Sequence, residues 1–238
     1  MNKDGYKESL FTSAAQMEGA DNYNEWTFDL FRQFIRGDVL EVGCGVGSFT
    51  GRIIRQSSFD SLLSIDISHD AVDYCRDNFI HTSLKFECVD IQLVNGKFDA
   101  VICMNVLEHI EDHENALRHM FDLLKPDGKL FLLVPAHQFL YNRFDLEGGH
   151  FRRYDKQAVR ELLSRAAGDR LYVLEQFYFN IVGALGYWFV YKVLNKIPQQ
   201  GAKSEIGFFD KLVVPVMSKL EGRFMPFGIS LISIVTKR

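Results

Sequence analysis

The sequence lacks the cysteine and histidine patterns of a disulfide-stapled or metal-dependent protein. Its four cysteines form no C-x-x-C pair and show no metal-ligand spacing with histidine, so they predict neither a disulfide framework nor a zinc site. Two of them, Cys88 and Cys103, lie inside apolar runs, where a thiol usually packs as a small hydrophobe. We therefore expect a reduced compartment and no metal ligands.

The sequence also lacks an excess of positive charge and long apolar runs. The formal net charge of the 238 residues is −4, whereas a surface that coats nucleic acid needs a basic footprint. No apolar run reaches the roughly 20 residues that span a bilayer, and Met1 to Gly19 has no apolar core of a signal peptide. With 47% apolar and 24% charged residues, the chain is expected to be one cytoplasmic globular domain over residues 1–238.

A regular alternation of short apolar strands and helical stretches fills most of the chain. The expected strands are Asp38–Val42, Ser61–Asp66, Leu84–Val89, Phe98–Cys103, Gly128–Val134, Leu171–Phe177 and Ile229–Thr236. The expected helices are Asn22–Ile35, 47–56, 70–79, 111–124 and 155–166, with a helix stop and turn at residues 124–128. Strands rich in Val, Ile and Leu with helices between them predict an α/β fold with a doubly wound parallel sheet.

The most specific motif is a glycine-rich loop that follows the first expected strand. Glu41-Val42 leads into Gly43-Cys44-Gly45-Val46-Gly47 and then a helix, and glycine there permits a tight turn and close approach of a ligand. A dinucleotide-binding loop would place its last glycine at Ser48 and would hold a pyrophosphate. The Glu41 carboxylate would repel that group and suits a ligand with an ammonium and a sulfonium. The alternative is a surface glutamate beside a turn.

Two further acids lie at the ends of the next two expected strands. Asp66 can accept both ribose hydroxyls of an adenosine, or it can cap a helix. Asp90 can bind an adenine amino group, with Ile67 and Ile91 on either side of the ring, or it can be a turn residue. Because the carboxyl ends of parallel strands share one edge of a sheet, we expect the acids to line one crevice.

Taken together, these motifs resemble those of class I S-adenosylmethionine (SAM)-dependent methyltransferases. Beyond the glycine loop, residues 98–110 (FDAVICMNVLEHI) are similar to the family's fourth strand and the segment after it, and residues 123–130 (LLKPDGKL) to the turn before its fifth strand. Asp127 stands where the family more often has glycine. The resemblance covers roughly residues 20–177 and the final strand.

The resemblance implies a mostly parallel, Rossmann-like sheet of seven strands whose last strand is antiparallel. It also implies SAM as cofactor, with the methionine part at the glycine loop, the ribose at Asp66, the adenine at Asp90 and the inner edge at Asn105. Tyr23 could cover the cofactor or simply pack its helix. The implied cofactor-binding residues are Tyr23, Glu41, Gly43, Cys44, Gly45, Gly47, Asp66, Ile67, Asp90, Ile91 and Asn105.

Candidate catalytic groups follow the fourth and fifth strands. His109 could be a general base, since its ordinary pKa of about 6.5 permits that role near neutral pH, or it could be a packing residue. In Gly-His-x-Arg-Arg-Tyr, His150 could be a base while Arg152 and Arg153 hold a carboxylate or phosphate; Tyr154 completes this set. The alternative is a solvated basic turn with Tyr154 packed before a helix. The phrase is similar to one in a bacterial group associated with glycan and lipid assembly.

The sequence lacks two motifs of enzymes that methylate nucleic acid, which restricts the class of methyl acceptor. Met104-Asn105-Val106-Leu107 is not the Asn/Asp-Pro-Pro-Tyr/Phe motif of enzymes that methylate base amino groups, and no Pro-Cys pair serves cytosine C5. With the acidic charge, this predicts no nucleic acid partner and favours a small-molecule, sugar or lipid-linked acceptor. Two other classes stay open: a dinucleotide-dependent oxidoreductase and a non-catalytic SAM-binding module.

Residues 178–226 interrupt the alternation between the sixth and seventh strands. Gln176–Tyr191 carries no charge and is rich in aromatics, and residues 178–226 hold six Lys/Arg against three Asp/Glu. A helix apolar on all sides must be buried or meet lipid, and aromatics beside lysines suit an anionic membrane surface. The insertion is thus an acceptor lid, a dimer surface or, through 177–197, a peripheral contact with the inner face of the membrane. The oligomeric state stays open.

Overall fold

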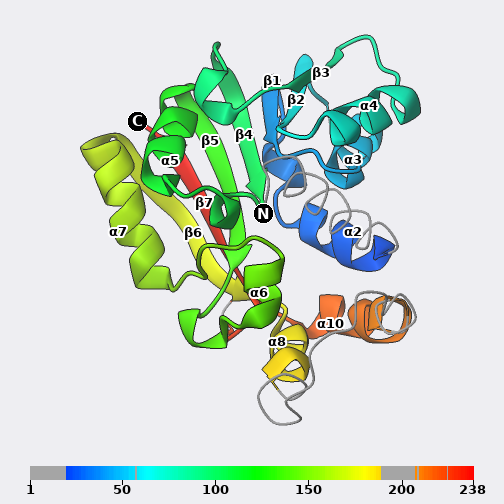
Figure 1. The fold of residues 1–238 in the computed structure, drawn as a ribbon, viewed down its shortest axis with the longest axis vertical. Coiled ribbons are helices and arrows are strands. Elements are labelled where there is room, and N and C mark those ends of the chain that lie inside the picture. Colours follow the sequence, from blue (N-terminus) through cyan, green and yellow to red (C-terminus); the bar gives the residue numbers. More distant parts are fainter. Residues whose placement is uncertain (1–19, 57, 189–206, 208, 224) are drawn as a thin grey trace.

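The computed structural model describes residues 20–56, 58–188, 207, 209–223 and 225–238. In this part of the chain, seven strands form one sheet in the order β3-β2-β1-β4-β5-β7-β6 (Figure 1). The strands are β1 (Asp38–Val42), β2 (Ser61–Asp66), β3 (Leu84–Cys88), β4 (Phe98–Met104), β5 (Leu124–Pro135), β6 (Leu171–Phe179) and β7 (Ser230–Lys237). Among them β7 runs antiparallel to both of its neighbours, β5 and β6, and the other four pairs are parallel. The predicted mostly parallel α/β sheet is confirmed.

Helices cover both faces of this sheet. One face carries α5 (His113–Asp122) and α7 (Lys156–Ala167), whose leucines, alanines and Phe121 pack on the interior of β4 and β5. The other carries α2 (Asp21–Asp29), α3 (Ser48–Gln56) and α10 (Val214–Leu220). Helix α4 (His69–Asn78) packs beside them on β3. Because both faces are covered, the central strands are nearly continuous runs of apolar residues.

The main boundary difference lies before the fifth strand. Residues 124–128 were expected to be a turn, but β5 already begins at Leu124, which pairs with Phe98. The register shifts between Phe98 and Ala100, and Asp127 adopts a φ of +62°. Pro126 is tolerated because it lies in this irregular start of the strand. The leading helix is also shorter than expected, since α2 ends at Asp29 and residues 32–34 form a 3₁₀ turn.

The insertion between β6 and β7 packs against the start of the described chain. Its described elements are α8 (Ile181–Trp188), a π-helical turn at Phe209–Val213 and α10, while 189–206, 208 and 224 lie outside the described residues. Asp210 is buried and accepts hydrogen bonds from the backbone N–H groups of Asn22 and Tyr23. It thereby caps α2, whose own N-cap residue, Ala20, offers no side-chain acceptor.

No helix in the described residues combines the length and hydropathy that crossing a membrane requires. Helix α8 is apolar, but it ends at Trp188 within the described segment. The rest of the aromatic stretch predicted to contact the membrane, residues 189–197, lies outside the described residues.

Candidate functional site

The glycine loop joins β1 to α3 at the carboxyl edge of the sheet. Gly43, Gly45 and Gly47 all have positive φ, at +78°, +53° and +77°. A Cβ on Gly43 would lie 2.3 Å from Val106 Cγ2, in the segment after β4. The backbone N–H groups of Gly43 and Cys44 both donate to the Ile65 carbonyl of β2. Glycine is thus required both by the conformation and by the close approach of the neighbouring segment.

Glu41 is buried beneath this loop. Its Oε2 accepts hydrogen bonds from the hydroxyls of Thr50, at 2.5 Å, and Ser64, at 2.7 Å. Burial raises the pKa of the carboxyl from 4.5 to about 7, against the lowering effect of these two hydrogen bonds. Because its side chain is only 3% exposed, the surface-glutamate alternative is wrong. Glu41 ties β1, β2 and α3 together under the loop.

Asp66 holds the loop from the adjacent strand. Its two carboxylate oxygens accept the backbone N–H groups of Gly45, at 3.0 Å, and Ser68, at 2.9 Å. Burial raises the pKa of Asp66, although these hydrogen bonds oppose the rise. A carboxylate has about four acceptor positions, so Asp66 keeps acceptor capacity for a ligand hydroxyl. Repulsion from the Asp66 carboxylate in turn raises the pKa of Glu41.

Of the three residues predicted to bind adenine, Asp90, Ile67 and Ile91, only two have side chains open to a ligand. Asp90 is exposed beyond the end of β3, and its Oδ1 accepts the backbone N–H of Gln92 at 2.9 Å. Ile67 is half-buried, but Ile91 is only 4% exposed and packs into the core. In this conformation the Ile91 side chain therefore presents little surface to a ring, because it fills the space under a 3₁₀ turn.

The other predicted cofactor residues have distinct surroundings. Asn105 is exposed at the end of β4 with a φ of +54°, a conformation uncommon for a residue other than glycine. Cys44 is buried beside Cys75. Tyr23 packs its ring 5.9 Å from that of Phe179, at the end of β6. This contact agrees with the packing alternative for Tyr23, and a role in covering the cofactor stays a prediction.

His109 and His150 meet although they lie in separate segments. Their ring centroids are 4.6 Å apart in an edge-to-face arrangement. His109 Nδ1 lies 3.3 Å from the Gly149 carbonyl oxygen, and His150 Nδ1 lies 3.0 Å from Asp145 Oδ1. Burial, followed by repulsion from His150, lowers the pKa of His109 to about 4. A group with that pKa is a weak base at neutral pH.

Glu108 is the third member of this cluster. It is 1% exposed, and neither of its carboxylate oxygens has a hydrogen-bond partner among the described residues. One ligand atom from each of Glu108, His109 and His150 lies within 4.8 Å of the other two. Burial raises the pKa of the Glu108 carboxyl to about 7, although the charges of His150 and Arg153 lower it.

Asp145 supports the cluster from α6 (Arg143–Glu147). It is fully buried and receives hydrogen bonds from Arg153 Nε, at 2.9 and 3.0 Å, and from the Tyr187 hydroxyl of α8, at 3.2 Å. Burial alone would raise its pKa, but the hydrogen bonds from His150 and Arg153 outweigh burial, so the pKa of Asp145 is lowered. The carboxylate is ionised at neutral pH, and α8 of the insertion reaches it directly.

The structure corrects the expectation that Arg152 and Arg153 bind an anionic acceptor. Arg152 donates to the backbone carbonyls of Ile110, at 2.7 Å, and Glu111, at 3.1 Å. Arg153 is buried and bound to Asp145. The buried guanidinium of Arg153 must have its donors satisfied inside the protein, and the half-buried Arg152 is held by the two main-chain carbonyls. Both arginines therefore fasten the loop to the fold.

Tyr154 is also an internal residue. It is 2% exposed, and its hydroxyl lies 2.9 Å from His113 Nδ1 and 3.3 Å from the Leu107 carbonyl oxygen. Burial raises its pKa, which removes it as a base. The solvated-turn alternative is wrong for Arg153, which is buried, whereas the packing of Tyr154 before α7 is as that alternative predicted.

Sequence reasoning missed Glu108 and Asp145. The only signal in the sequence for Glu108 was its position directly before the candidate base His109. Asp145 lies five positions before His150, in a segment where no helix was expected. Neither position revealed that its carboxylate would be buried, because that depends on contacts between separate segments.

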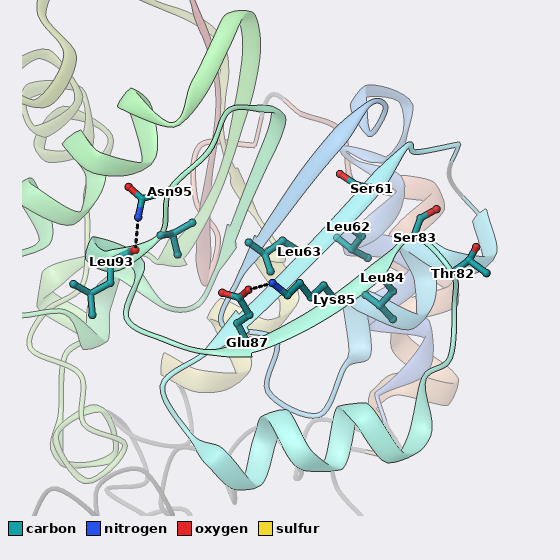
Figure 2. Close-up of a pocket in the computed structure, with 11 residues that line it drawn as sticks. Ser61, Leu62, Leu63, Thr82, Ser83, Leu84, Lys85, Glu87, Leu93 and Asn95 are labelled. Carbon is teal, nitrogen blue, oxygen red and sulfur yellow. Dashed lines mark hydrogen bonds and ion pairs between the residues drawn. The ribbon is translucent and has the colours of Figure 1, made fainter.

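A separate hollow lies on the β2–β3 side of the sheet (Figure 2). It is lined by Leu63, Lys85, Glu87, Leu93 and Asn95, among others. Lys85 and Glu87, neighbours on β3, form an ion pair at its edge, so these two charges are matched within the lining. None of the residues described as lining it belongs to the glycine loop, the strand-end acids or the histidine cluster.

Comparison with known proteins assigns the chain to a protein family. Residues 18–168, more than half of the chain, match the family model described as a methyltransferase domain. Ubiquinone biosynthesis O-methyltransferases are among the relatives: the mitochondrial protein of Saccharomyces cerevisiae is 32% identical over 111 residues, and that of Coxiella burnetii is 26% identical over 118 residues. These alignments cover 44% and 48% of this chain, but only 36% and 50% of the relatives.

Solved structures extend the likeness over the whole fold. A methyltransferase of Haloferax volcanii, determined in complex with the Trm112 methyltransferase activator, superposes with a TM-score of 0.68 at 17% identity, covering 98% of this chain and 96% of that one. At this identity the likeness establishes the fold alone.

Proposed function

Because the chain belongs to the class I SAM-dependent methyltransferase family, we propose that it transfers a methyl group from SAM to a small-molecule acceptor. The observation that carries the proposal is the conjunction of the glycine loop with Glu41 and Asp66. Asp66 holds Gly45 of the loop, and Glu41 lies buried beneath it. The two carboxylates make this pocket suited to a cationic adenosyl ligand and unsuited to a pyrophosphate.

The residues present fit SAM at each of its polar parts. The glycine loop leaves its backbone open where side chains would collide with neighbouring segments, so a ligand can approach closely. Glu41 can hold the ammonium group, and the remaining acceptor positions of Asp66 can take ribose hydroxyls. Asp90, which is exposed at the next strand end, can take the adenine amino group.

When bound, SAM supplies an electrophilic methyl group that is already activated by its sulfonium. The protein must then align the acceptor, exclude water and take up a proton when the nucleophile is a hydroxyl. We assign activation of the acceptor to the cluster of Glu108, His109 and His150, because it holds titratable groups in the segment after β4 and the loop after α6. Arg152 and Arg153 keep the loop that carries His150 in position.

The acceptor-side loop supports placement in the bacterial group with the Gly-His-x-Arg-Arg-Tyr phrase, and with it a lipid-linked acceptor as the finer proposal. Exposed apolar side chains on the insertion also support a lipid-linked acceptor. Leu212, Val216 and Leu220 follow one another at helical spacing and are 59%, 55% and 69% exposed. Such a face, beside lysines, suits the surface of an anionic membrane.

We therefore propose that the 178–226 insertion closes over the acceptor and rests on the inner face of the membrane, within a single 1–238 domain. Flotation with vesicles that contain anionic lipid tests the contact. The protein should float with anionic vesicles and stay at the bottom with neutral ones, and Val216→Glu should abolish flotation. Equal sedimentation in all cases contradicts membrane contact and leaves methyl transfer untouched.

Calorimetric titration with SAM and with NAD tests the main proposal. SAM should bind, Asp66→Ala should weaken it, and NAD should not bind. His150→Ala should abolish methyl transfer to the true acceptor while SAM affinity is kept, and Arg152→Ala should act likewise through loss of loop anchoring. NAD binding without SAM binding would favour an oxidoreductase. SAM binding with no transfer to any candidate acceptor would favour a non-catalytic module.

A further inference from the structure

The geometry points to a divalent transition-metal site formed by Glu108, His109 and His150, for which Zn²⁺ is a suitable ion. The site lies between the segment after β4 and the loop after α6. The sequence predicts no metal ligands, since His150 lies far along the chain from the adjacent Glu108 and His109, with no recognisable ligand spacing. Folding alone brings them within reach of one ion.

The unpartnered Glu108 carboxylate is the observation that calls for a ligand. It is 1% exposed, and both of its oxygens lack a hydrogen-bond partner among the described residues. Buried polar atoms are nearly always satisfied, and an exception in a folded protein often marks an absent ion or water. The cation next to this region, Arg153, is already bound to Asp145. A metal ion between the two imidazoles would satisfy Glu108.

The second observation is how the two imidazoles are held. A carbonyl and a carboxylate can only accept hydrogen bonds, so Nδ1 of His109 donates to Gly149 and Nδ1 of His150 donates to Asp145. Metal-binding histidines typically donate one ring N–H to a carbonyl or carboxylate in this way, which orients the ring and its other nitrogen. Nε2 of each ring would therefore bind the ion while both hydrogen bonds are kept.

The donor set decides the class of ion. Two imidazole nitrogens and one carboxylate oxygen suit Zn²⁺ and its neighbours, whereas Mg²⁺ and Ca²⁺ prefer oxygen ligands alone. Ligand atoms of a tetrahedral zinc complex lie roughly 3.4 Å apart. The present separations of the ligand atoms, within 4.8 Å, would shorten by up to roughly 1.4 Å when the ion binds.

Three protein ligands leave one coordination position open. An acceptor hydroxyl bound there would lose its proton more readily, because the ion stabilises the oxyanion. This use of the ion rests on the proposed methyl transfer, but binding of the ion does not. Metal binding can be measured without SAM, and SAM binding can be measured in the presence of a chelator, so failure of either leaves the other standing.

The test uses the full chain without a histidine tag, stripped with a chelator and titrated with Zn²⁺ by calorimetry. One ion per chain should bind, and Mg²⁺ should not compete. Glu108→Gln and His150→Ala should each weaken binding by roughly 100-fold or more, while His69→Ala, a change at an exposed histidine on α4, should bind as the wild type does. Circular dichroism establishes that each variant is folded.

Cobalt substitution gives a readout on the wild type that does not depend on any variant folding. One equivalent of Co²⁺ should give the strong visible absorption of a four-coordinate ion. The proposal is overturned if the wild type binds no Zn²⁺ saturably, if Glu108→Gln binds as tightly as the wild type, or if Co²⁺ shows only the weak spectrum of the hydrated ion.

Discussion

Glu41 provides a pH-dependent prediction whose size follows from its burial. The fold raises the pKa of this carboxyl from 4.5 to about 7. At about 1.4 kcal/mol for each pH unit, the difference corresponds to roughly 3 kcal/mol. The folded state holds the proton more tightly than the unfolded chain. The stabilisation is therefore fully present below about pH 4.5 and is lost as the pH rises through about 7.

The perturbation is Glu41→Gln, which keeps a carbonyl oxygen for the hydroxyls of Thr50 and Ser64 but cannot ionise. The free energy of unfolding of the variant, relative to the wild type, should increase by roughly 3 kcal/mol between pH 4.5 and pH 8. The increase arises because the wild type alone must bury a charge at the higher pH.

Urea unfolding without ligand, followed by circular dichroism at a series of pH values, measures this difference. Glu161→Gln is the matched control, since Glu161 is an exposed carboxylate on α7, and its curve should follow that of the wild type. Parallel pH profiles for Glu41→Gln and the wild type would refute the assignment of the raised pKa to Glu41.

Further predictions concern the ligand, the loop and two buried acids. Since the SAM ammonium needs ionised Glu41, SAM affinity measured by calorimetry should fall up to roughly tenfold for each pH unit below 7; a flat profile would disprove this. Gly47→Ala should weaken SAM binding and lower thermal stability by about 1–2 kcal/mol, because its φ is +77° and its Cβ would meet Phe79 at 2.2 Å. Asp210→Ala should cost about 1–2 kcal/mol in urea unfolding through loss of the α2 cap, and an unchanged midpoint would contradict that role. Asp145→Asn should cost about 3–5 kcal/mol, since it leaves a buried guanidinium without its anion; thermal unfolding would show it.

Much of the fold could be predicted because its signals are local. Apolar strands such as Asp38–Val42 and Ser61–Asp66 have the bounds expected from the sequence, since a buried parallel strand is a short run of branched apolar residues. The glycine loop was likewise evident, because positive φ restricts the residue type at Gly43, Gly45 and Gly47. The antiparallel last strand came from the family resemblance, not from periodicity.

The irregular start of β5 shows where such local signals end. Pro126 and Asp127 indicate a turn by their residue types, yet pairing of Leu124 with Phe98 draws them into the strand. The gain from strand pairing outweighs the local preference, and it depends on a partner far away in the sequence.

The amino-acid sequence alone determined most strands, the glycine loop and the edge of the sheet that carries the acids. Tertiary structure decided what the charged side chains do. Arg153 could not be recognised as the internal partner of Asp145, nor Glu108 as a buried acid between two histidines, before the segments that carry them were placed together. The physical reason is that residue type sets a charge, whereas solvent exclusion and the nearest partner set its energy, and both belong to the folded chain.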